Sequence, residues 1–352
     1  MTGAKQADTA VTHDISAGRP LSLAVTAPVT AHALAGRPAS LNDLEQEPVK
    51  AKKTPQLSTA KQRELGAELR RIRMRAGYLA TDMSRMLGWP ASTISRLESG
   101  LRSYQAGDIA IYLARAKATP QELDDLVALD RHPDDGYQVR SHPTGFPDDL
   151  PLITVLDTGS QSITTYDRVD IPRQLQIEPY VREALTRNGH GDGPALDIAV
   201  RTRLASQAAS LRIPGPFTFY LHETTLLARP EEPSVKHEQV LHLLITSSLP
   251  RHHIHLVPDH FALSSLHTGF ALYLHDQHLP LVHHQQPTTS LFLENDDDVA
   301  FYEGQLERIA REALTRQQTR DWLMRHLAEL ELELDHRHRE PGISRSDRLP
   351  RS

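Results

Sequence analysis

The chain has 352 residues, a formal net charge of −6 and no cysteine. The lack of cysteine excludes disulfide bonds, thiolate metal sites and a cysteine nucleophile, and it fits a reducing cytoplasm. No apolar run approaches the ~20 residues that cross a bilayer, and the first residues lack the pattern of a secretory signal. We therefore expect a cytoplasmic protein with no membrane partner, and the length predicts two domains with flexible segments.

The overall acidic charge conceals a local basic region. Residues 1–57 are rich in Ala, Thr, Ser and Pro and show neither a helical nor a strand period, which predicts a disordered segment. Between Lys61 and Ser103 the chain carries nine Lys and Arg residues but only four Asp and Glu residues, a net charge of +5. A basic module on an acidic body is typical of a protein that binds nucleic acid.

Helical periodicity begins near Thr59 and predicts a helical domain over residues 58–130. The first helix has one apolar stripe, because its members are spaced four, three and four residues apart. They are Leu65, Leu69, Ile72 and Ala76. Gly77 is a suitable end for this helix. Its other face carries arginines that either form a solvated surface or contact phosphate, namely Arg70, Arg71 and Arg75.

Four shorter helices complete the predicted domain as a unit of five. The second ends at Gly88, the third lies within GWPASTISRLESG (88–100), and the last two cover 105–118 and 119–130. The last helix begins with a capping box, in which Thr119 is followed three residues later by a glutamate.

The second and third helices form a predicted helix-turn-helix at residues 80–99. Ile94 and Leu97 can seat the third helix on its neighbours, which leaves a short row of small, hydroxylated and basic side chains pointing outward. Such side chains fit a major groove, where Ser and Thr reach base edges and Arg can be bidentate to guanine. The predicted base contacts are Ala91, Ser92, Thr93, Ser95 and Arg96.

The remainder of the chain predicts a linker and a second domain of the α+β class. Residues 131–149 contain several prolines and glycines and are expected to be a linker. Residues 150–334 form the predicted α+β domain, and residues 335–352 a flexible tail. The domain's predicted helices include 196–211, 234–249, one that follows the NDDD stretch at 295–298, and a last one bearing Leu323, Leu327, Leu330 and Leu334. Its predicted strands are 217–223, 253–258, 270–275, 280–284 and 290–294.

Two family resemblances rest on these segments. LGAELRRIRMRAGYLATDMSRMLGWPASTISRLESGLRS, within residues 63–125, closely resembles the Cro/repressor-type (XRE) helix-turn-helix family. Residues 150–332 resemble the Scr1-type domain of unknown function attached to such modules in actinobacterial regulators, through stretches such as RTRLASQ, FYLHETTLLARP and LFLENDDDVAFYEGQLERIAREAL. The resemblance implies an all-α, five-helix, lambda-repressor-like DNA-binding domain followed by the α+β domain. It also implies an internal ion pair between Arg73 and Glu98.

The sequence departs from the DNA-binding family at two places. Many members begin the second helix with Thr-Gln, whose amide meets a backbone phosphate, whereas this chain has Leu79 and Ala80. Pro90 stands where a Ser or Thr cap is usual, although proline is acceptable in a first helical turn. The remaining candidates for phosphate contact are Thr81, Arg85, Arg102 and Ser103.

Two motifs raise other chemistries. VLDTGSQS (155–162) resembles the aspartic-peptidase signature, but that reaction needs two carboxylates and the chain has no second copy. Eleven histidines lie between His237 and His284, and His253 and His255 would share one strand face as a pair of zinc ligands. We expect neither catalysis nor a metal or other cofactor, and whether residues 237–284 bind metal or sense pH stays open.

These observations favour a sequence-specific transcriptional regulator that binds double-stranded DNA as a homodimer. Its C-terminal domain would sense a small protein or small-molecule effector and promote dimerisation. An antitoxin-like adaptor that binds protein, with weak or no DNA binding, is the alternative. An enzyme housed in the second domain is supported only by the DTGS motif and the histidines.

Overall fold

The computed structural model describes residues 57–339 apart from short gaps at 103, 143–149, 190, 211–212, 214, 229, 231 and 262–267. The predicted disordered segment (residues 1–56 of it), the phosphate candidate Ser103 and residues 340–352 of the predicted tail therefore lie outside the described residues.

The N-terminal part of the described chain is helical. Its helices are α1 (Ala60–Arg75), α2 (Ala80–Leu87), α3 (Ala91–Glu98), α4 (Ala106–Arg115) and α5 (Pro120–Arg131). They enclose one apolar core that includes the predicted stripe residues Leu65, Leu69 and Ile72, together with Met83, Ile94, Leu97 and Tyr112. Sequence signals place the helix ends, because Thr59 caps α1, Thr119 caps α5, and both form capping boxes.

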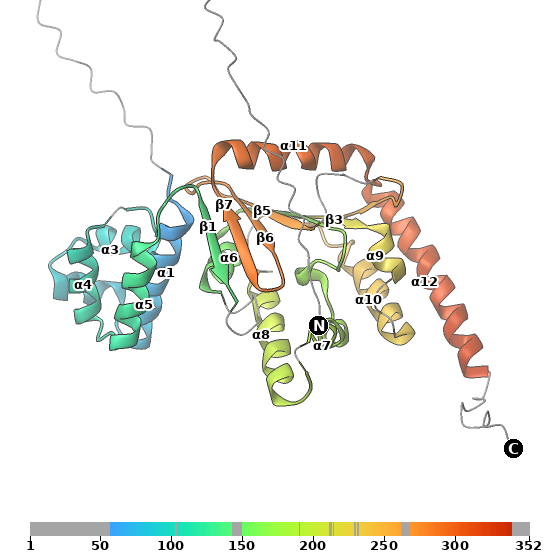
Figure 1. Ribbon diagram of the computed structural model, residues 1–352, viewed down its shortest axis with the longest axis horizontal. Coiled ribbons are helices and arrows are strands. Elements are labelled where there is room, and N and C mark those ends of the chain that lie inside the picture. Colours follow the sequence, from blue (N-terminus) through green and yellow to red (C-terminus); the bar gives the residue numbers. More distant parts are fainter. Residues whose placement is uncertain are drawn as a thin grey trace, which may run out of the picture. The chain divides into compact units, whose positions relative to one another are not determined.

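The C-terminal part is built on a mixed sheet of seven described strands (Figure 1). They are β1 (Tyr137–Ser141), β2 (Ser162–Asp167), β3 (Phe217–His222), β4 (His252–Val257), β5 (Phe270–Leu274), β6 (Leu281–Gln285) and β7 (Thr289–Leu293). The order across the sheet is β1-β7-β6-β5-β2-β3-β4. Strands β2, β3 and β4 are parallel, whereas β5, β6, β7 and β1 join the other edge of β2 as antiparallel neighbours.

Helices cover both faces of this sheet (Figure 1). One face carries α6 (Pro151–Gly159), the short 3₁₀ turn η2 (Arg173–Leu175), α7 (Glu178–Arg187), α8 (Pro194–Ser210), α9 (Glu223–Ala228) and α10 (Pro233–Thr246). The other face packs against α11 (Asp296–Glu312) through an apolar cluster that contains Tyr166, Phe270, Val282, Val299 and Ile309. The last helix, α12 (Arg316–Arg339), packs on α10 and β4.

Several sequence expectations need correction here. The predicted linker contains a strand, since Tyr137–Ser141 forms β1 and pairs with β7 along its whole length. The sequence QVR alternates, but five residues among prolines and glycines gave too weak a period to detect. The predicted tail begins too early, because α12 continues to Arg339.

Polar contacts join the start of α1 to the sheet. The Glu294 carboxylate, at the end of β7, accepts a hydrogen bond from the Ala60 backbone N–H at 2.6 Å. It also forms an ion pair with Arg63 at 3.2 Å. A second ion pair links Arg140 of β1 to Glu64 at 2.9 Å. Burial raises the pKa of Glu294 to about 7 against the opposing effect of Arg63. The first helix of the N-terminal domain therefore begins at the sheet.

Candidate nucleic-acid interface

Helix α3 is held from its inner side by two apolar anchors. Ile94 is fully buried and Leu97 is 3% exposed, so the opposite side of this short helix faces outward. Gly88 makes the preceding turn with a φ of +67°, a conformation that favours glycine, and ends α2. Pro90 occupies the cap position immediately before α3.

The predicted base-contacting residues lie on this outward side. Four of them are exposed: Ala91, Ser92, Ser95 and Arg96. The fifth, Thr93, is half-buried, and its hydroxyl accepts a hydrogen bond from Arg102 Nη1 at 3.0 Å. Arg102 is itself exposed, so one predicted phosphate contact lies directly beside one predicted base contact. The surface offers small side chains, hydroxyls and guanidinium groups, which are the groups that read base edges and neutralise phosphates.

The start of α2 is less suited to bind a phosphate than the Thr-Gln pair that many members of the resembled helix-turn-helix family have there. Leu79 stands at the helix cap with its side chain 67% exposed, and it provides no side-chain hydrogen bond to the helix N-terminus. Asp82 instead accepts a hydrogen bond from the Leu79 N–H at 2.8 Å. The phosphate candidate Thr81 is exposed, and Arg85 is exposed but pairs with Asp82 at 2.9 Å. The carboxylate at this position partly offsets the positive charge that would attract DNA.

An ion pair lies on the buried side of α3. Arg73 of α1 donates to both carboxylate oxygens of Glu98, from Nε and from Nη2, each at 2.7 Å. The Tyr112 hydroxyl of α4 donates to Glu98 Oε1 at 2.6 Å, and burial together with the Glu98 charge raises the pKa of that phenol. Glu98 therefore joins three helices inside the domain, and its charge is compensated on the side of α3 that faces the domain core.

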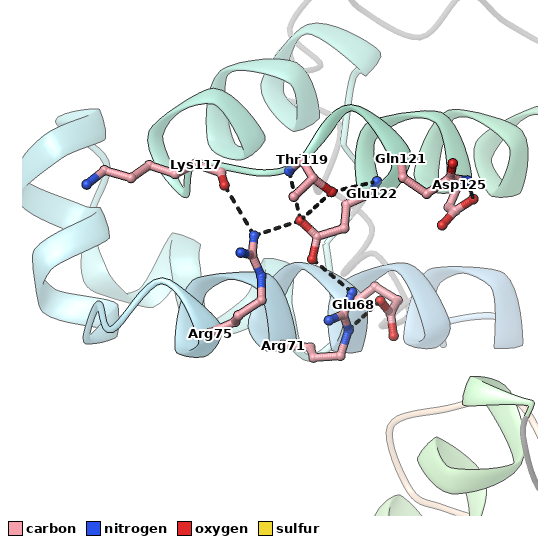
Figure 2. A network of polar contacts seen from close by, with 8 residues as sticks. All are labelled: Glu68, Arg71, Arg75, Lys117, Thr119, Gln121, Glu122 and Asp125. Carbon is pink, nitrogen blue, oxygen red and sulfur yellow. Dashed lines mark hydrogen bonds and ion pairs between the residues drawn. The ribbon is translucent and has the colours of Figure 1, made fainter.

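Two of the α1 arginines are occupied by a network with α5 (Figure 2). Glu122 accepts ion pairs from Arg75 at 2.7 Å and from Arg71 at 3.3 Å, and Glu68 binds Arg71 from the same helix at 2.8 Å. The backbone hydrogen bond at Thr119 and the two arginines lower the pKa of Glu122. All three arginines are exposed, but these ion pairs make Arg71 and Arg75 part of the α1–α5 packing.

The residues of the two motifs that suggested other chemistries bond to other residues of the protein. Asp157 of the DTGS motif is 1% exposed; it forms an ion pair with Arg173 and accepts a hydrogen bond from the Tyr273 hydroxyl at 3.2 Å. His255 and His253 share a face of β4, and their rings bond to the carbonyls of Leu314 and Pro250. Within the part of the chain that the structure describes, no group of three or more His, Cys, Asp or Glu residues could hold a metal ion.

The C-terminal domain contains a cavity of about 520 Å³ that the sequence did not indicate. Its floor is formed by alternate residues of three neighbouring strands, which are Thr165 and Asp167 of β2, Ala271 and Tyr273 of β5, and His283 and Gln285 of β6. The segment after β2 and helices α7 and α8 form its walls. These segments are distant in the sequence, so no local motif marks the site.

Comparisons with known proteins agree with this division. Residues 64–126 match a family described as a helix-turn-helix domain, and residues 150–325 match a domain of unknown function, DUF5753. No curated protein matches the chain. A solved structure titled as TrmBL2, an archaeal chromatin protein with a novel mode of DNA binding, aligns with a TM-score of 0.28 and 8% identity over 60% of this chain and 72% of that one. A likeness of that size carries no functional weight.

The helical domain and its exposed α3 define a helix-turn-helix protein, and this domain indicates DNA binding. Because the second match extends over half of the residues, the chain belongs to the DUF5753 family. None of the helices in the described ranges has the length and apolarity that a membrane crossing requires.

Proposed function

We propose that this protein is a cytoplasmic transcriptional regulator of the Cro/repressor (XRE) type, without enzymatic activity, that binds double-stranded DNA as a homodimer through α3. The observation that carries the proposal is the outward side of α3. Ala91, Ser92, Ser95 and Arg96 are exposed on a helix whose other side is fixed by buried anchors. A helix so short and so poor in apolar residues gains its specificity from the groove it enters.

The C-terminal domain supports the sensing half of the proposal. Its cavity has a volume typical of small-molecule sites. The contacts of Glu294 with Ala60 and Arg63 connect the sheet that floors the cavity to the first helix of the DNA-binding domain. A ligand that changes the sheet therefore has a physical route to α1, and through the Arg73–Glu98 pair to α3.

DNA selection followed by quantitative mobility shift tests the proposal. The full-length protein is used to select duplexes from a random library, and the selected duplex is then titrated at several salt concentrations. Arg96→Ala should weaken binding to that duplex by about 1–3 kcal/mol and relax sequence preference. Arg102→Ala should weaken binding to all duplexes by a similar factor. It should also reduce the slope of log affinity against log salt concentration by about one.

A matched control comes from the C-terminal domain. Arg311 is exposed on α11, so Arg311→Ala removes the same charge from a different domain and should change neither quantity. If Arg96→Ala and Arg102→Ala behave like this control, α3 is not the recognition helix. Failure to enrich any duplex at low salt, together with co-purification of a small protein, would favour the antitoxin-like adaptor, which the exposed Leu79 at the α2 cap also favours.

A further inference from the structure

The cavity lies where the pairing of the sheet changes from parallel to antiparallel. After β2 the chain crosses to β3 on one side, whereas β5 pairs with β2 on the other side. Ligands of open α/β sheets commonly bind beyond the carboxyl ends of the parallel strands. Strand β2 ends at Asp167, which lines the cavity.

The wall after β2 is fixed by amide side chains. Gln176 donates to the Ile171 carbonyl at 2.7 Å. Gln239 of α10 donates to the Leu175 carbonyl at 2.8 Å and accepts from the Ile177 N–H at 3.0 Å. These contacts hold an irregular segment in one conformation, as a site prepared for a ligand requires.

Two of the charged residues in the lining already have partners of opposite charge. Asp170 binds Arg187 at 3.7 Å, and Arg173 forms its ion pair with Asp157. Neither Arg187 nor Asp157 lines the cavity. These two pairs leave the local charge balanced and do not define what the cavity takes.

Asp167 differs, because no cationic side chain of the described residues forms an ion pair with it. Burial raises its pKa to about 7. Gly269 lies beside its carboxylate, and a Cβ at position 269 would come within 2.8 Å of Asp167 Oδ1. A carboxylate in this setting is stabilised by a ligand that brings an ammonium group.

The cavity also contains a guanidinium group. Arg203 of α8 is 7% exposed and donates from Nη1 to Gln176 Oε1 at 2.9 Å. A guanidinium group has five N–H donors, so it can bind an anionic ligand group in addition to its protein contacts. The lining between the charged residues is apolar and includes Ile171, Leu185 and Phe270. Asp167 and Arg203 in this lining carry charges of opposite sign, which favours a dipolar ligand over a strongly charged one.

We propose that the cavity binds a free amino acid with an apolar side chain, its ammonium group on Asp167 and its carboxylate on Arg203. The apolar lining receives the side chain. The role of this amino acid as the effector of DNA binding rests on the proposed function, whereas its binding does not.

Thermal shift and calorimetry on the full chain, without DNA, test the site. Each standard amino acid is added at millimolar concentration, with spermidine and AMP as a cationic and an anionic comparison. Leucine is also compared with isoamylamine and 4-methylpentanoate, which each lack one of its charged groups. We expect one or more apolar amino acids to raise Tm, and the compounds that lack a charged group to bind at least about tenfold more weakly.

Two variants locate the contact. Asp167→Asn should weaken amino-acid binding by about tenfold or more, whereas Asp297→Asn, an exposed aspartate in α11, should bind like the wild type. The proposal is overturned if no amino acid raises Tm, if only spermidine or AMP does, or if Asp167→Asn binds as tightly as the wild type. If the amino acid binds but DNA affinity does not change, the site stands and the sensing role fails. Absence of DNA binding contradicts the proposed function and leaves the amino-acid titration valid.

Discussion

Arg73 and Glu98 form a bidentate ion pair that fixes the end of α3 to α1 from the side that faces the domain core. Both side chains are buried, and Glu98 also accepts the Tyr112 hydroxyl. The pair therefore orients α3 without occupying its outward side. It also means that a carboxylate within the proposed DNA-binding helix adds no repulsion toward phosphate, because its charge is neutralised inside the protein.

Removal of one partner of this pair should be costly. Arg73→Ala leaves the Glu98 charge buried without its guanidinium, so we expect a loss of about 3–5 kcal/mol in the free energy of unfolding. Arg71→Ala is the matched control, because Arg71 is half exposed in its ion pairs and such pairs contribute about 0–1 kcal/mol. Denaturant unfolding of both variants checks this. Similar losses in the two would show that the buried pair does not hold α3.

A close approach between α1 and α3 gives a second prediction. A Cβ at Gly66 would lie 2.6 Å from the Leu97 carbonyl oxygen and 2.8 Å from the Glu98 carbonyl oxygen. These are backbone atoms and cannot move aside alone, so Gly66→Ala should destabilise the domain by roughly 1–3 kcal/mol through overpacking.

The control for Gly66 lies in the neighbouring helix α4. Gly107 has open space around the Cβ position, and Gly107→Ala should stabilise the domain by roughly 0.5–1 kcal/mol because alanine favours a helix. The melting temperatures of the two variants should therefore move in opposite directions. A gain for Gly66→Ala would mean that α1 and α3 are farther apart than described.

The elements with strong local signals were predictable from the sequence. The strands predicted at 217–223 and 270–275 correspond to β3 and β5, and the NDDD stretch lies at the start of α11. The outward side of α3 followed from helical spacing alone, since Ile94 and Leu97 fix which side turns inward. Capping by Thr119 could also be predicted, because a capping box depends on two residues three positions apart.

The cavity was not predictable, because it is made by tertiary structure. Strand β2, SITTYD, is rich in Ser and Thr and lacks a clear apolar alternation, although it lies in the middle of the sheet. Asp167, Arg203 and His283 come from a strand, a helix and a second strand, and only the sheet order brings them to one lining. Similarly, nothing local marks Glu294 as the partner of Arg63.

A substitution at the N-cap of α2 should stabilise the protein. Leu79 exposes an apolar side chain and gives no hydrogen bond to the helix N-terminus. Leu79→Thr supplies a hydroxyl acceptor at this position, and we expect a stabilisation of about 0.5–2 kcal/mol in thermal or denaturant unfolding. Leu79→Ala removes the same apolar surface without adding an acceptor, so it should not give this gain. If alanine stabilises as much as threonine, the effect comes from the exposed leucine and not from the cap.

The raised pKa of Asp167, about 7, makes the stability of the C-terminal domain depend on pH in a defined direction. In the unfolded chain this carboxyl has a pKa of about 3.9, so the folded state holds its proton more tightly. The bound proton's favourable contribution to the free energy of unfolding is complete below the pKa of the unfolded chain. It is lost as the pH rises through about 7. Asp167→Asn cannot ionise and avoids this loss. The Tm of Asp167→Asn relative to the wild type should therefore rise between about pH 5 and about pH 8.

The comparison of these two proteins isolates Asp167, because every other group titrates in both. Thr165, Asp170 and Arg173 act directly on this carboxyl group. Arg203 and His283 line the same cavity. Asp297→Asn, exposed on α11, should keep a constant Tm difference from the wild type over the same range. A constant difference for Asp167→Asn as well would place its carboxylate in solvent and remove the electrostatic reason for an ammonium group in the cavity.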